Sequence, residues 1–429
     1  MSDETITLCN APPVTADLPP PHRPPHHHDH LTRRSLVAGA GGLLMLAAAQ
    51  GSAQATTTGV ADGGPGKQKY GATRASTITK GTTLVHADLH NHSLMSDGGG
   101  NPEFAFASMR DGGLDVAALT DHTTLNGIRG LSPKDWKKTG RLADAANDPG
   151  AYTALRGFEW SHPLLGHVNV WFTGDFTDLG ESGTVGKLFD WIRHSGGISS
   201  FNHPGREPRR FNEFAYDPRM RDQMVALEMF NQREDFLFDG FHHGRTSPMN
   251  TCLNAGWRTG LSGVTDEHGD DWGLTEGKGR TGLWVTHNSR NGVLEAMRAR
   301  RFFATRVSGF RLDALADGVR MGGSLPITKG DVRFQVDLDR GKRWAGKRLD
   351  LQVLRPGTHV PSVVDVITAE AGRTSTFTVP LNLSDGEWVV IRVADPERKN
   401  DTPGPAGHPC NDWGAAYTSP WWITAKRDG

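Results

Sequence analysis

The stretch that decides the fold is LVHADLHNH, residues 84–92, a short apolar run that leads into two histidines. Its β-prone residues predict a strand over 83–89. Side chains two positions apart on an extended chain point to the same side, so His90 and His92 can reach one cation together. Imidazole nitrogens are ligands of borderline divalent ions such as zinc, manganese or iron. The stretch therefore predicts a metal ligand pair at a strand end.

Short apolar runs alternate with helical patterns over residues 83–306, which is typical of βα units and a parallel sheet. Helices are expected over 102–109 and 185–194, and further strands over 116–119, 154–158, 167–172, 197–201, 225–229 and 261–265. Acidic and histidine side chains lie at or just beyond the ends of these elements: Asp97, His122, Glu159, His167, His203, Glu228, Asp266 and His268. Parallel barrels build their sites at one rim, so a site for several metal ions is predicted.

The ordered motifs resemble the PHP (polymerase and histidinol phosphatase) superfamily. The matching segments are Asp88-Leu89-His90-Asn91-His92, Ser96-Asp97-Gly98, Thr120-Asp121-His122, Gly157-Phe158-Glu159, Gly166-His167, Asn202-His203-Pro204 and Asp266-Glu267-His268. The resemblance covers residues 82–306 and implies an α/β fold, a distorted seven-stranded (β/α)7 barrel, with a trinuclear metal centre. Within the superfamily, the chain is most similar to the secreted branch that includes carbamate-ester hydrolases.

The resemblance also implies which residues hold the three divalent ions (Mn, Zn or Fe). The first ion would be held by His90, His92, Glu159 and Asp266, the second by Glu159, His167 and His203, and the third by Asp97, His122 and His268. Asp97 stands where some members carry histidine, an exchange that alters the metal preference of the third site. Asp121 is expected to orient a ligand.

Two cations bridged by Glu159 would lower the pKa of a water held between them toward ~7, so hydrolysis by a metal-bridging hydroxide is the expected reaction. The catalytic residues are expected to be Glu159, His203, Asp266 and Arg206. A net positive metal centre favours a small anionic substrate, above all a phosphate ester. Arg206 follows His203 closely and would clamp a phosphate oxygen, or is an ordinary surface arginine. Glu228 either positions substrate or is structural.

Other functions stay open from the sequence. A carboxylic or carbamate ester hydrolase would use the same centre, because hydroxide attacks a carbonyl carbon as well as phosphorus. A non-catalytic metal-binding or polymer-binding protein is the alternative from another class. No nucleic-acid partner is expected, because 47 basic residues balance 48 acidic ones in a chain of net charge −1.

The two ends of the 429-residue chain carry separate predictions. Paired Arg33 and Arg34 before a mild apolar stretch and an A-x-A site predict a twin-arginine signal over 1–55, hence a secreted protein without an integral membrane span after signal removal. Residues 56–82 are expected to be a flexible lead-in. Alternating β runs after 306 predict a β-sandwich over 307–429, in which Trp421-Trp422 packs in the core or forms a sugar platform. Cys252 and Cys410 would pair or stay free.

Overall fold

The computed structural model describes residues 72–124, 130–207, 209–273 and 275–425. The predicted export signal (1–55) and the first part of the predicted lead-in lie outside the described residues. The end of the lead-in is bonded to later parts of the chain: Ala72 N donates to Gly309 O at 3.1 Å, and Thr77 N to Asp337 Oδ2 at 2.8 Å. Within the described ranges, no helix combines the length and apolar character that crossing a bilayer requires.

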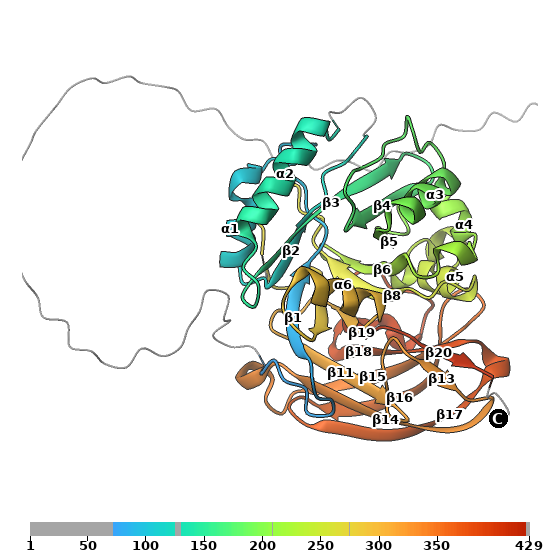
Figure 1. The fold of residues 1–429 in the computed structure, drawn as a ribbon. Coiled ribbons are helices and arrows are strands. Elements are labelled where there is room, and N and C mark those ends of the chain that lie inside the picture. Colours follow the sequence, from blue (N-terminus) through green and yellow to red (C-terminus); the bar gives the residue numbers. More distant parts are fainter. Residues whose placement is uncertain (1–71, 125–129, 208, 274, 426–429) are drawn as a thin grey trace, which may run out of the picture. The chain divides into compact units, whose positions relative to one another are not determined.

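Strands and helices alternate in the first part of the chain, which confirms the α/β prediction. The strands are β1 (Thr83–Asp88), β2 (Val116–Leu119), β3 (Thr153–His162), β4 (Gly166–Trp171), β5 (Ile198–Phe201), β6 (Met224–Asn231), β7 (Glu234–Asp235) and β8 (Gly260–Val264). The helices are α1 (Pro102–Asp111), α2 (Pro133–Ala146), α3 (Val185–Ser195), α4 (Arg210–Phe214), α5 (Pro248–Asn254) and α6 (Arg290–Arg298). Figure 1 shows α1 and α2 together beside β2, and α3–α5 beyond β4–β6.

Local sequence signals set the helix ends. Asn101 caps α1 by accepting from Glu103 N, and Ser132 and Asp135 form a capping box at the start of α2. Helix α3 ends at Gly196, whose φ of 75° suits a residue without a side chain. These ends fix where the chain returns to the sheet.

The sheet is not parallel throughout, which corrects the sequence-based expectation. β1–β2, β2–β3, β5–β6 and β6–β8 are parallel pairs, but β4 runs antiparallel to both β3 and β5. Only residues 163–165 join β3 to β4, and so short a connection permits a hairpin but no crossover. Because β4 is reversed, its first residues lie at the same edge as the last residues of β3.

The end of β8 returns to the end of β1. Asn91 and Glu267 form an isolated parallel bridge, and Asp266 N donates to His90 O at 3.0 Å. The segments that carry the predicted ligands therefore meet at one edge.

Strands β9 (Arg280–Val285) and β10 (Phe302–Thr305) join the two parts of the chain and were absent from the sequence-based strand assignment. β9 pairs antiparallel with β1 and with β10, and β10 pairs with β19 of the C-terminal part. One continuous hydrogen-bonded sheet thus crosses the predicted domain boundary at residue 306.

The C-terminal part is a β structure in which every pair of strands is antiparallel except β13–β20. It contains β11 (Arg311–Ala316), β12 (Val319–Arg320), β13 (Ser324–Pro326), β14 (Lys329–Asp339), β15 (Arg348–Arg355), β16 (Ser362–Glu370), β17 (Thr374–Asn382), β18 (Trp388–Lys399), β19 (Asp412–Thr418) and β20 (Trp421–Thr424). Strands β12-β11-β14-β17 form a separate sheet. Phe334, Ile391 and Trp421 belong to one buried core cluster with residues of both sheets. Trp422 is also buried, so the tryptophan pair is core and not an exposed sugar platform.

Candidate metal centre

The structure brings all nine predicted ligand residues together at the edge where β1, β3 and β8 end. Their side chains form groups in which one nitrogen or oxygen atom per residue lies within 4.8 Å of the others. The groups are His90, His92 and Asp266; His122, Glu159 and His167; His92, Asp97, His122 and His268; and His167, His203 and Glu207. Each of these groups shares at least two residues with one of the three ion sites that the PHP resemblance implies.

The first group is fully enclosed. His90 Nε2 lies 3.2 Å from Asp266 Oδ1, and His92 Nε2 lies 3.0 Å from the same oxygen. Glu159 Oε1 is 3.2 Å from His90 Nε2. His90, His92 and Glu159 are completely buried. Three imidazole and carboxylate ligands thus face one point, as the spacing of His90 and His92 predicts.

Glu159 lies at the centre of the cluster. Its Oε2 is 2.8 Å from His122 Nδ1, and its Oε1 is 3.4 Å from His167 Nδ1 and 3.3 Å from His203 Nε2. Asn202 Nδ2 donates to Glu159 Oε1 at 2.7 Å and fixes the carboxylate. Glu159 therefore directs one oxygen at His90, His167 and His203 and the other at His122.

The third group lies nearest to solvent. Asp97 Oδ2 is 3.4 Å from His268 Nε2 and 3.6 Å from His122 Nε2, and Asp97 Oδ1 is 3.7 Å from His92 Nδ1. The side chain of His268 is 38% exposed and that of Asp97 is 20% exposed. A substrate would reach the cluster from this side.

The sequence reasoning missed Glu207. Its Oε1 lies 3.4 Å from His203 Nδ1 and 3.8 Å from His167 Nε2. No strand ends at residue 207, so the search for acids at strand ends passed over it. The available signal was its position four residues after His203.

The donor atoms fit divalent cations. Ligand atoms about 2.1 Å from a tetrahedral ion lie about 3.4 Å from one another, and most nitrogen–oxygen separations above are of this size. Six buried atoms of the cluster make no well-directed hydrogen bond to the residues that the structure describes, although several of them lie within 3.5 Å of another polar atom of the cluster. They are His92 Nδ1, Glu159 Oε2, His167 Nδ1, His203 Nδ1, Glu207 Oε2 and Asp266 Oδ1. Buried polar atoms are normally paired, so a cation is the partner that most of these atoms call for.

The electrostatics of the cluster agree with cation binding. Burial lowers the pKa of His92 to about 3, and the charge of His122 adds to this. Burial also opposes charge on His90, but the Asp266 and Glu159 carboxylates outweigh it and raise the pKa of His90 well above its usual value. Although burial resists it, the surrounding imidazoles hold the pKa values of Glu159 and Asp266 well below their usual range. Protons therefore gather on imidazoles, and a cation must displace them, so metal affinity rises with pH.

Glu228 contacts His90, one of the predicted ligands. It is completely buried, and its Oε1 lies 2.8 Å from His90 Nδ1. Its Oε2 accepts from His203 N at 2.7 Å and from Asn231 Nδ2 at 3.1 Å. When a carboxylate accepts the proton of one imidazole nitrogen, the other nitrogen of the ring is free to bind a metal.

Asp121 orients a loop of the cluster. It accepts from Ser93 N at 2.8 Å and from Ser96 Oγ at 2.8 Å. These bonds hold the loop that carries Asp97, which agrees with the orienting role predicted for Asp121.

Arg206 lies at the rim but already has acidic partners. Its Nη1 donates to Asp266 Oδ2 at 3.2 Å, and its Nη2 donates to Glu234 Oε2 at 2.9 Å and to Asn231 Oδ1 at 3.1 Å. The side chain is 39% exposed. It is therefore beside the cluster, and it would have to exchange a carboxylate for substrate in order to bind phosphate.

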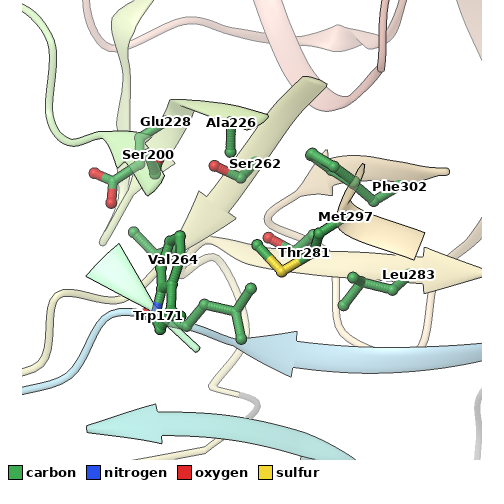
Figure 2. A pocket seen from close by; sticks show the side chains of 11 residues that line it. Trp171, Ser200, Ala226, Glu228, Ser262, Val264, Thr281, Leu283, Met297 and Phe302 are labelled. Carbon is green, nitrogen blue, oxygen red and sulfur yellow. Dashed lines mark hydrogen bonds between the residues drawn. The ribbon is translucent and has the colours of Figure 1, made fainter. Parts of the chain in front are cut away.

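A small cavity lies inside the sheet beside Glu228 (Figure 2). It has a volume of about 10 Å³, room for about one water molecule, and Trp171, Leu283 and Phe302 supply much of its apolar lining. This space is too small to hold a substrate.

Comparison with known proteins gives a likeness to one family model and likenesses to solved structures. A family model described as "Protein of unknown function (DUF3604)" matches residues 100–175. No curated protein matches the chain. A solved two-domain protein from Bacteroides vulgatus, described as containing a predicted PHP-like metal-dependent phosphoesterase, is 15% identical with a TM-score of 0.45, over 82% of this chain and 100% of that chain. An amidohydrolase from Chromobacterium violaceum is 15% identical with a TM-score of 0.29, over 44% of this chain and 89% of that chain.

Proposed function

We propose that this chain is a metal-dependent hydrolase of the PHP type that binds three divalent cations and cleaves phosphate esters. The observation that carries the proposal is the convergence of buried imidazoles and carboxylates on Glu159, with donor atoms that lack hydrogen-bond partners. In a purely structural network, buried polar atoms form hydrogen bonds with one another. In this cluster, several buried nitrogen and oxygen atoms instead converge on common points without forming such bonds.

Bound divalent ions would supply hydroxide at neutral pH and would stabilise the charge that develops on the oxygen under attack. The chain's own residues would do the rest. Asn202 fixes Glu159, and Glu228 fixes His90, so the ligand geometry exists before substrate arrives. Arg206 supplies a positive charge beside Asp266, where a phosphate oxygen would bind.

A carboxylic or carbamate ester is the second candidate substrate, because the cluster carries more acid than the sequence indicated. Three divalent ions would bring six positive charges, and the five carboxylates of the cluster would leave one. These carboxylates are Asp97, Glu159, Glu207, Glu228 and Asp266. In addition, Leu94 and Leu164 are exposed in the segments next to Asp97 and His167. A centre of low charge with apolar neighbours suits an uncharged ester.

Metal analysis joined to a substrate panel tests the proposal. The mature protein, loaded with Mn²⁺, Zn²⁺ or Fe²⁺, would be assayed on activated phosphate monoesters and diesters and on carboxylate and carbamate esters. We expect about three ions per chain and turnover that a chelator abolishes. Turnover on carbonyl esters alone would select the second candidate. Failure to hydrolyse any ester when fully loaded, or full activity after chelation, would refute the hydrolase proposal.

The matched variants are His203→Ala and His194→Ala. His203 faces Glu159, whereas His194 is exposed on α3. We expect His203→Ala to lose activity by orders of magnitude while its circular dichroism is unchanged, and His194→Ala to keep full activity.

We also propose that the protein is secreted through the twin-arginine pathway. The support is the order of Arg33-Arg34, the apolar stretch and the A-x-A site in the sequence. A route that exports folded proteins suits a chain that must acquire metal ions first.

A further inference from the structure

Two imidazoles of the cluster lie between two carboxylates. His203 directs Nε2 at Glu159 Oε1, 3.3 Å away, and Nδ1 at Glu207 Oε1, 3.4 Å away. His167 directs Nδ1 at Glu159 Oε1, 3.4 Å away, and Nε2 at Glu207 Oε1, 3.8 Å away. Each ring thus has an inner nitrogen that faces Glu159 and an outer nitrogen that faces the same oxygen of Glu207.

A neutral imidazole carries one proton, so its two nitrogens cannot both be free to bind a metal. If the inner nitrogens of His167 and His203 bind the second ion with Glu159, the protons must lie on the outer nitrogens. Both outer N–H groups then need an acceptor, and Glu207 Oε1 is the carboxylate oxygen placed to serve both. A movement of the Glu207 carboxylate by about half an ångström toward the two rings would bring both contacts close to hydrogen-bond distance.

We propose that Glu207 is the positioning carboxylate of the second-ion site, accepting from His203 Nδ1–H and His167 Nε2–H and thereby fixing the tautomers of both rings. The inference rests on the proposed metal centre. It assigns to that centre a residue outside the ligand set that the PHP resemblance implies. One carboxylate then controls both histidines of one ion, so its loss affects that ion before the others.

The chain around Glu207 is held at several points. On one side, His203 N donates to Glu228 Oε2 at 2.7 Å. Gly205 lies so close to Asp239 that a Cβ there would be 1.6 Å from Asp239 Oδ2. At Glu207 itself, Arg245 Nη2 donates to the backbone oxygen at 3.4 Å.

On the other side, the chain is bonded to the turn that precedes His167. Arg209 N donates to Leu164 O at 3.0 Å and Phe211 N to Leu165 O at 2.5 Å. The following turn α4 has positive φ at five successive non-glycine residues, 31–57°, a conformation that L-residues avoid. Phe211 and Phe214 of this turn are buried. Glu207 is therefore held between the two histidines by both ends of its segment.

The experiment uses the Zn²⁺-loaded full chain with ¹⁵N-labelled histidine. Two-bond ¹H–¹⁵N spectra report which ring nitrogen carries the proton, and Zn²⁺ titration reports the affinity of each ion. We expect His203 protonated at Nδ1 and His167 at Nε2. Glu207→Ala should weaken the second ion about 10–100-fold, so that zinc content falls from three to two per chain. Glu207→Gln, which keeps one acceptor oxygen, should lose less.

The matched control is Glu234→Gln, which removes a carboxylate at the same rim that pairs with Arg206. It should leave zinc content unchanged, which separates the effect of Glu207 from a general loss of negative charge. Three bound ions with His203 protonated at Nε2, or normal second-ion affinity in both Glu207 variants, would overturn the inference alone. A wild-type chain that binds no zinc would instead refute the metal centre itself.

Discussion

Replacing Glu228 by glutamine should cost the first ion while leaving the fold intact. The carboxylate accepts from the backbone of His203 at 2.7 Å and faces His90 Nδ1 at 2.8 Å. The backbone N–H of His203 is always a donor, so the glutamine oxygen must face it. The glutamine NH₂ then faces His90 Nδ1, which must become an acceptor. The ring proton moves to Nε2, the nitrogen directed at Asp266 and Glu159.

A protonated Nε2 cannot bind a metal, so the affinity for the first ion should fall about 10–100-fold, or about 1.4–2.7 kcal/mol. The metal-free protein loses one charge-assisted contact and keeps a neutral one, a difference of about 1–2 kcal/mol in the free energy of unfolding. Both quantities are measurable on one preparation, by metal titration and by urea unfolding in chelator.

The matched control is Asp235→Asn, another buried carboxylate, which accepts from Tyr417 Oη at 2.8 Å and lies 3.4 Å from the buried Arg392 Nη2. It should lower the free energy of unfolding by at least as much, because the buried Arg392 loses its partner charge, and it should leave every metal affinity unchanged. If Glu228→Gln bound the first ion as tightly as the wild-type chain, the assignment of Glu228 as the group that sets the His90 tautomer would be wrong.

Three further outcomes are expected. Arg206→Ala should raise the KM for a phosphate ester about 10-fold or more and leave the KM for a neutral ester nearly unchanged, and equal effects on both would exclude a phosphate-binding role. Cys252 and Cys410 are free and buried, and burial raises the pKa of both thiols, that of Cys410 to about 12. Neither thiol should therefore react with a thiol reagent until the protein unfolds. Rapid labelling of the native chain would contradict this. Exchanging Arg33 and Arg34 for lysines should keep the protein in the producing cell, and undiminished export would argue against the twin-arginine route.

The sequence predicted the strands that carry the site because their apolar runs are short and end in ligand-type residues. β2 spans the residues expected, and β1 and β5 differ by one residue at one end. It did not predict the reversal of β4, since alternation alone does not reveal strand direction. The three residues between β3 and β4 were the available signal.

The joining strands were harder to predict. β9 and β10 are buried on all sides, so their sequences lack the alternation of a strand with one face in water. Their partners, β1 and β19, lie far away in the chain. No local pattern reports such pairings.

The residues that surround the ligands were the other gap in prediction. Glu228 was placed at the rim, but the choice between positioning substrate and a structural role depended on its contact with His90, 138 residues earlier in the chain. Arg206 was expected either to clamp a phosphate oxygen or to be a surface arginine, and its pairing with Glu234 depends on a turn that returns to β7. Sequence motifs identify the residues that could bind a metal. The residues that hydrogen-bond to those ligands come from other helices, strands and turns, which no local motif marks.

Because β10 pairs with both β9 and β19, the two parts of the chain cannot easily be separated. A chain cut after residue 306 would keep β10 but leave one side of it as a bare row of amide and carbonyl groups, open to other chains. The two halves therefore cannot be exchanged between proteins at this junction as independent modules are. They must be inherited together, and they should melt together in a single transition.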